Sequence, residues 1–149
     1  MRRVIILKEL RMNSFSANLS IEELEKDKWK EPDFFPTDLV EKCFKYRKIP
    51  VKDLTTEQLR TLIGQNIGLK YLIPLTIERL RNNVLAEGDF YPGDLLNAVI
   101  TSEVVYWKAN PVLHKTIAEL IDSHLEILQQ NISIRQFYRD IEIFKRVIY

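Results

Sequence analysis

The helical character of this chain is clearest in residues 110–148, which read NPVLHKTIAELIDSHLEILQQNISIRQFYRDIEIFKRVI. Asn110 followed by Pro111 is a typical helix start, because proline lacks the N–H that the first turn leaves unpaired. Ser133, with Gln136 three residues on, predicts the cap of a second helix, and the short gap predicts an antiparallel pair. The expected buried faces repeat every three or four residues: Leu113, Ile117, Leu120, Ile121, His124 and Leu128, then Ile134, Phe137, Ile141, Phe144 and Ile148.

The same spacing predicts helices further upstream. Ser20 and Thr55 each precede a Glu or Gln by three residues, which is the capping-box pattern, and Thr37 can cap another helix. We therefore expect an all-α, single-domain bundle of about six to seven helices, with a possible short irregular or strand segment at the N-terminus. Residues 1–18 are expected to be an N-terminal extension or irregular segment, and residues 19–149 a single helical domain. The upstream helices are expected near residues 20–29, 37–49, 55–63, 71–80 and 95–100.

Gly64-Gln65-Asn66-Ile67-Gly68 lies between two of these expected helices. It lacks the lysine and serine of a nucleotide-binding P-loop and the third glycine of a dinucleotide-binding loop. We interpret it as a helix-ending turn in which Gly68 adopts the left-handed conformation. Pro74 is expected in the first turn of the helix that follows.

The composition is that of an ordinary globular protein. The chain has 149 residues, of which 46% are hydrophobic and 29% charged, enough to bury a core without disulfides or metals. Cys43 is the only cysteine, which excludes an intrachain disulfide and fits a reducing compartment. The apolar run Val4–Leu7 is too short for a signal-peptide core, and no stretch approaches the roughly 18 residues of a membrane span. We expect a cytoplasmic protein.

Charge is distributed in blocks although the net charge is only +1. Residues 13–41 carry eight acidic and three basic side chains, residues 42–84 carry three and nine, and residues 85–126 carry seven and two. These blocks either neutralise one another in the fold or leave an acidic face for a basic partner. The basic residues of 42–52 around Tyr46 are either a solvated helix face or a patch for RNA.

The sequence offers no catalytic, cofactor-binding or metal-binding constellation. His114 and His124 are ten residues apart on different faces of one expected helix, and no zinc pattern joins them to Cys43. His124 is expected to be a hydrogen-bonded core histidine, and Cys43 a buried structural thiol. We therefore predict that the protein is not an enzyme and uses no cofactor.

The most unusual local sequence is residues 87–94, EGDFYPGD. It fails as a calcium-binding EF-hand loop, because the ligand spacing and the terminal glutamate are missing. One interpretation is a rigid turn that caps the following helix through Asp94. A second is a partner-binding loop with acidic groups and aromatic anchors, and a third is a small ligand- or metal-binding domain that uses the carboxylates. The candidate interface residues are Glu87, Asp89, Phe90, Tyr91 and Asp94.

Two stretches resemble a known family: LRTLIGQNIGLKYLIPL (59–75) and LAEGDFYPGDLL (85–96). Together with 29–36, Arg47-Lys48 before Pro50, and Trp107, they are similar to the immunity proteins of bacterial contact-dependent growth inhibition (CDI) systems. Thr76 and Val84 depart from that pattern, where a small apolar residue and a proline are usual.

The resemblance implies a cytosolic protein that binds and neutralises the C-terminal domain of a cognate CDI toxin, often a nuclease. It implies neither direct nucleic-acid binding nor a membrane. Because each member must recognise a different toxin, shared motifs are expected to serve the scaffold more than the interface, and this bears on residues 85–96.

Overall fold

The computed structural model describes residues 17–148, so the predicted N-terminal segment lies almost wholly outside them. This part of the chain contains α-helices, one 3-10 turn, η1 (Val51–Asp53), and an isolated antiparallel bridge between Ser20 and Pro50. The prediction of an all-α fold is confirmed. No helix within 17–148 is long and apolar enough to cross a membrane. The helices are α2 (Ile21–Glu25), α3 (Asp38–Tyr46), α4 (Thr56–Gly64), α5 (Leu69–Asn82), α6 (Asp94–Ile100), α7 (Val104–Ala109), α8 (Pro111–Ser123), α9 (Leu125–Asn131) and α10 (Arg135–Arg146).

The described residues form nine α-helices, where six to seven were expected. One addition is α7, which is too short to show an apolar period. The other arises because the expected helix over 110–131 breaks at His124, whose backbone (φ −120°, ψ 16°) leaves the helical region. The Nδ1–H of His124 donates to the carbonyl oxygen of Leu120 at 2.8 Å, and its ring is only half-buried. The fully buried histidine is His114.

The helix starts predicted from capping patterns are confirmed at four of five positions, including Asn110–Pro111 at the start of α8. Ser20 and Thr55 form complete capping boxes, and the hydroxyl of Thr37 accepts from the backbone N–H of the third helical residue. The predicted cap at Ser133 is wrong: α10 begins two residues later, without a side-chain cap. Its first turn is instead fixed by the packing of its apolar face.

The turn before α5 differs from expectation in register. Gly68 is left-handed, with φ +65°, as predicted, but it precedes α5 as its N-cap and does not end α4. Since α5 begins at Leu69, two residues earlier than expected, Pro74 lies inside the helix and not in its first turn. Pro74 is buried there, and the helix continues through it to Asn82.

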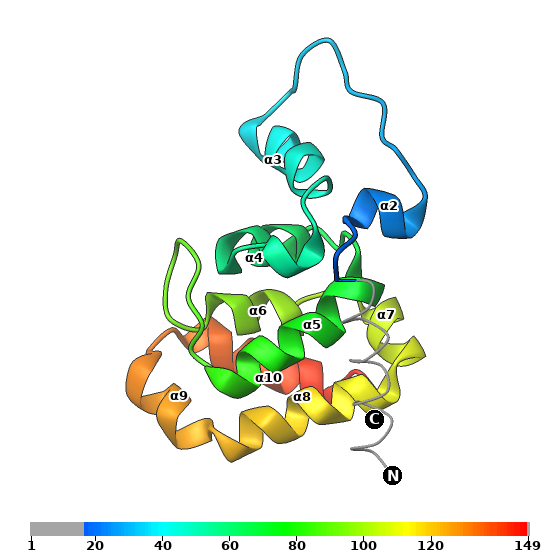
Figure 1. Cartoon of the computed structure of the whole chain (residues 1–149). Coiled ribbons are helices and arrows are strands. Elements are labelled where there is room, and N and C mark those ends of the chain that lie inside the picture. The colour runs from blue at the N-terminus through cyan, green and yellow to red at the C-terminus, as the bar shows by residue number, and fades with distance from the viewer. Residues whose placement is uncertain (1–16, 149) are drawn as a thin grey trace.

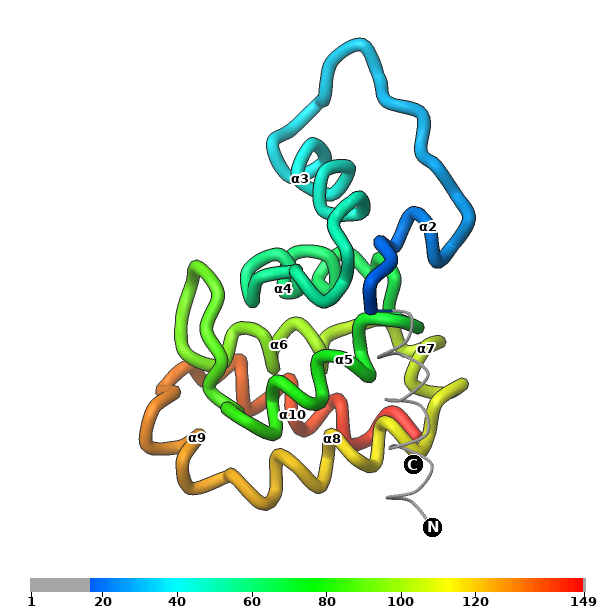
Figure 2. The backbone as a smooth tube through the Cα atoms, viewed as in Figure 1, coloured from blue at the N-terminus to red at the C-terminus, as the bar shows by residue number. Residues whose placement is uncertain are grey.

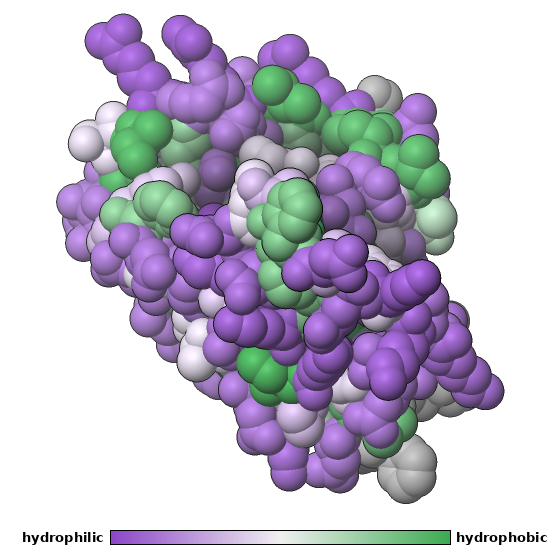
Figure 3. Space-filling model, turned by 90° about the horizontal axis from the view of Figure 1, so that it is seen from above, coloured by the Kyte–Doolittle hydropathy of each residue, from purple (hydrophilic) through white to green (hydrophobic). Residues whose placement is uncertain are grey.

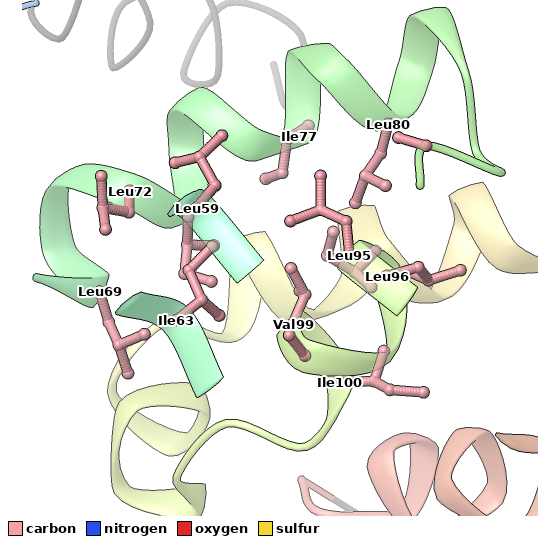
Figure 4. Packing of buried hydrophobic residues seen from close by; sticks show 14 of the residues in the cluster. Leu59, Ile63, Leu69, Leu72, Ile77, Leu80, Leu95, Leu96, Val99 and Ile100 are labelled. Atoms are coloured by element: carbon pink, nitrogen blue, oxygen red, sulfur yellow. The ribbon is translucent and has the colours of Figure 1, made fainter. Parts of the chain in front are cut away.

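The core is built where α4 packs against α5 and α6. The side chains that meet there are almost completely excluded from solvent, so burial of each contributes roughly 1.5–3 kcal/mol relative to an exposed position. Figure 4 shows them converging from three helices into one continuous apolar layer. Its members include Leu59, Ile63, Leu69, Leu72, Ile77, Leu80, Leu95, Leu96, Val99 and Ile100.

An aromatic cluster closes the lower part of the core. The rings of Trp107 and Phe144 meet edge to face with centroids 5.0 Å apart, and His114 lies 4.2 Å from Phe144. The Nε2–H of His114 donates to the carbonyl oxygen of Phe144 at 2.6 Å. This contact ties α8 to α10, which run in opposite directions in Figure 1, as the sequence predicted.

Two irregular segments rise from the same side of this core (Figures 1 and 2). One connects α2 to α3 and covers residues 26–37, which we call the strap. The other connects α5 to α6, and its residues 87–93 are called the acidic loop. Helix α4 packs between α3 and α6, and it therefore supports the elements that carry both segments.

Gly93 and Gly64 give a matched pair of substitutions that tests the backbone geometry. At Gly93, φ is +89° and a Cβ would lie 2.4 Å from Cδ1 of Ile132, so we expect Gly93→Ala to lower the free energy of unfolding by about 2 kcal/mol. Gly64 ends α4, and within the described part of the chain a Cβ added there would meet no atom of another element within 4 Å, so Gly64→Ala should leave stability unchanged or raise it by up to about 1 kcal/mol. Urea unfolding measures both; equal losses would contradict the described turn.

Candidate functional site

The acidic loop is fixed by hydrogen bonds at both of its ends. The backbone N–H of Gly93 donates to the carbonyl of Leu85 at 3.1 Å, which closes the segment into a compact turn. The N–H of Asp94 donates to the carbonyl of Tyr91 at 3.0 Å, and the left-handed Gly93 directs the chain into α6. The loop is therefore an ordered projection (Figure 2).

Asp94 holds the loop from beneath. Its side chain is 4% exposed, and its two carboxylate oxygens accept from the N–H of Gly88 at 2.6 Å and of Phe90 at 3.0 Å. The prediction that Asp94 caps the following helix is thus wrong in detail, because Gly93 is the N-cap and Asp94 turns back to the preceding residues. Hydrogen bonds to a charged acceptor are stronger than neutral ones, which explains how one side chain orders the loop.

Helix α4 supplies a second support for the loop. The carboxylate of Glu57 accepts from the N–H of Asp89 at 3.0 Å and also pairs with Arg60. The guanidinium of Arg60 lies over the ring of Phe90, 4.4 Å from its centroid, and 3.9 Å from a carboxylate oxygen of Asp94. A cation held against a ring face in this way is attracted by the ring and stabilises this position of it.

The five candidate interface residues therefore divide into two groups. Glu87, Asp89 and Phe90 are exposed, Phe90 to 68%, and Tyr91 is half-buried. Burial, and then the neighbouring carboxylates of Asp94 and Asp140, raise the pKa of the Tyr91 phenol, so it stays neutral. Asp94 is buried with its oxygens occupied, and it lies too deep to meet a partner.

The carboxylates of residues 87–94 do not form a metal centre in the described structure. Within 17–148, no three His, Cys, Asp or Glu side chains are grouped so that they could hold a metal ion. The oxygens of Asp94 face the loop backbone, whereas Glu87 and Asp89 point to solvent. The alternative of a carboxylate-based metal site thus gains no support from the geometry.

The basic run at 42–52 is not a free cationic patch. Arg47 is buried, Lys48 pairs with Glu31 at 2.7 Å, and Lys45 pairs with Glu41 at 3.3 Å. The interpretation of this run as a solvated helix face is therefore wrong for Arg47. The RNA-binding alternative loses part of its charge to neighbouring acids.

Sequence reasoning did not single out the strap as a candidate site. Trp29 and Phe35 each meet Phe44 of α3 edge to face at 5.2 Å, and Phe34 between them faces solvent with 79% of its surface exposed. Arg47 reaches back from α3 and donates to the carbonyl of Asp27 at 2.8 Å. The sequence feature that could have identified the strap was the density of aromatic residues between two prolines, in a segment that cannot be helical.

Cys43 occupies a structural position, as the sequence predicted. Its side chain is buried on the inner face of α3, and burial raises the pKa of its thiol. A protonated, enclosed thiol is a poor nucleophile.

A family model described as CDI immunity proteins matches residues 23–117, which extend from α2 through the strap and the acidic loop into α8. Searches of the curated proteins and of the solved structures found no match.

The role of Asp94 can be separated from that of its exposed neighbour. Asp94→Ala removes the acceptor of two buried N–H groups, so we expect the free energy of unfolding to fall by about 2 kcal/mol. The amides of Gly88 and Phe90 should also exchange faster with solvent. Asp89→Asn leaves the loop backbone intact and should change stability by less than about 0.5 kcal/mol. Unchanged amide exchange in the Asp94 variant would refute this assignment.

Proposed function

The chain belongs to the CDI immunity proteins, and on this premise we propose that it neutralises a toxin domain of a contact-dependent growth inhibition system by binding it. The observation that carries the proposal is the extent of the family match. It covers α3 to α7 completely, together with both segments that project from the core. The partner in this proposal is the C-terminal toxin domain encoded with the chain, and the place of action is the cytoplasm.

Binding accounts for the described surface better than catalysis does. The side chains best suited to nucleophilic or acid–base chemistry serve the core: Cys43 is enclosed with a raised pKa, and His114 is bonded to the carbonyl of Phe144. The exposed large hydrophobic residues instead include two aromatic side chains on ordered loops, Phe34 and Phe90. Such anchors dominate the energy of protein interfaces because little conformational freedom is lost when they are buried.

The acidic loop is the part of the interface that the sequence suggested. Phe90 is preorganised beneath Arg60, while Glu87 and Asp89 add negative charge beside it. A toxin that acts on nucleic acid needs a basic surface to approach phosphates. We infer a nuclease as the toxin class, since the acidic loop would compete for that surface.

Co-expression tests the proposed function directly. The toxin domain encoded with this chain should arrest growth when produced alone, and production of this protein should restore growth, with a complex that co-purifies. Persistent arrest in cells that contain folded protein would show that the chain does not neutralise this toxin.

The contribution of the acidic loop can be measured with the purified toxin domain. Phe90→Ala should raise Kd by about tenfold or more, because an exposed anchor is lost without disturbing the core. Ile143→Ala, at an α10 position that is 60% exposed, is the control and should leave Kd unchanged. Equal affinities for the Phe90 variant and the wild type would place the interface elsewhere.

A further inference from the structure

The strap exposes an aromatic side chain that the fold itself does not use. Residues 26–37 have no regular secondary structure, and all of them except Trp29 and Phe35 are exposed. Phe34 has the largest exposed fraction, 79%, of the large hydrophobic residues in the described chain. Figure 3 looks onto this end of the molecule and shows hydrophobic residues as separate patches in a hydrophilic surface.

The strap is nevertheless held firmly. Trp29 and Phe35 pack edge to face against Phe44 from either side of the exposed segment. The guanidinium of Arg47 lies 3.9 Å from the ring centroid of Trp29 and donates to the carbonyl of Asp27 at 2.8 Å and to the carboxylate of Glu25 at 3.1 Å. Phe34 is therefore presented by a fixed backbone.

This arrangement is costly for a segment that adds little to the core. Arg47 is 1% exposed, its Nε has no hydrogen-bond partner among the described residues, and its carboxylate partner Glu25 remains partly in water. Taking a guanidinium out of water costs several kcal/mol before its contacts compensate. The ring of Trp29, the carbonyl of Asp27 and the carboxylate of Glu25 offset this cost, so specific contacts hold the strap in place while its tip stays exposed.

The charge around Phe34 indicates what the strap can meet. The strap as a whole has no net charge, because three lysines and one aspartate lie in residues 26–30; the acidic charge is confined to its second half and the start of α3, where residues 31–41 contain four acidic side chains and no basic one. Glu31 and Glu41 pair with lysines of α3 and its C-terminal end, whereas Asp33 and Asp38, on either side of Phe34, have exposed positions. An apolar anchor between two carboxylates is complementary to an apolar pocket rimmed by lysine or arginine.

We propose that the second half of the strap, residues 31–37, binds a lysine- and arginine-rich surface of the toxin domain, with Phe34 as its apolar anchor and Asp33, together with Asp38 at the start of α3, facing the basic residues. This inference rests on the proposed function and adds to the acidic loop a second, independent contact. The strap and the acidic loop share one local pattern: each exposed phenylalanine directly follows an aspartate, Asp33 before Phe34 and Asp89 before Phe90. Both segments would then bind the same basic partner.

Two substitutions in the strap separate the anchor from the charge. Phe34→Ala should raise Kd for the purified toxin domain by about thirtyfold, chiefly through faster dissociation. Asp33→Lys should slow association several-fold and weaken its dependence on salt, because a steering charge is reversed. Since both side chains are exposed, Tm should stay within a few degrees of the wild-type value.

Matched controls lie on other faces of the molecule. Val105→Ala changes a side chain on α7 that is 76% exposed, and Glu126→Lys reverses an exposed charge on α9. Neither should alter affinity or association rate. Stopped-flow association at several salt concentrations measures the association rate and its salt dependence, and calorimetry measures Kd.

The outcomes distinguish this inference from the proposed function. If the wild-type protein binds and neutralises the toxin but Phe34→Ala and Asp33→Lys behave like their controls, the strap is not part of the interface and this inference is wrong, while the function stands. If the wild-type protein does not bind the toxin, the function itself fails. If the wild-type protein forms a dimer in solution that Phe34→Ala disrupts, the strap binds a second copy, and the inference is overturned.

Discussion

The packing of α4 against α6 is the contact on which the rest of the molecule depends. The inner face of α4 contributes Leu59 and Ile63 to the apolar layer. Its outer face places Glu57 and Arg60 against the acidic loop. The same helix packs against α3, from which Arg47 reaches the strap. Core and projecting segments are thus joined through one nine-residue helix, and a shift of that helix would move both exposed phenylalanines.

Both projecting segments are ordered by a charged side chain hidden beneath them. Asp94 accepts two backbone N–H groups of the acidic loop, and Arg47 donates to a backbone carbonyl of the strap. Charged hydrogen bonds to the backbone fix a loop without demanding particular side chains at its tip. The loops are therefore ordered by these buried side chains, and their outer side chains are free to contact solvent or a partner.

The helical scaffold could be predicted from sequence because its signals are local. Apolar spacing identified most helices, and capping patterns placed the starts of those that follow Ser20, Thr37 and Thr55. Where a local capping pattern conflicted with tertiary packing, the pattern predicted the wrong helix start. Ser133 was expected to start the last helix, but α10 begins at Arg135, and its position follows from its buried aromatic face.

The arrangement of the candidate site could be predicted only in part. The acidic loop was recognised from its composition, yet the role of Asp94 was not, because its partners are backbone groups four and six residues before it. The ion pair between Arg47 and Glu25 joins positions 22 residues apart, and the Glu57–Asp89 contact joins positions 32 residues apart; local periodicity cannot show such pairs. A basic run gives no sign of which member is buried.

The placement of Asp94 and Arg47 below the surface has an evolutionary consequence. A side chain that fixes a loop through the loop's backbone groups does not depend on which side chains the exposed crest of that loop carries. Phe34, Phe90 and the aspartates beside them could be exchanged while the supports stay as they are. Under the proposed interface, a change of toxin partner requires substitutions at only a few exposed loop positions, and the folding of the scaffold is unaffected.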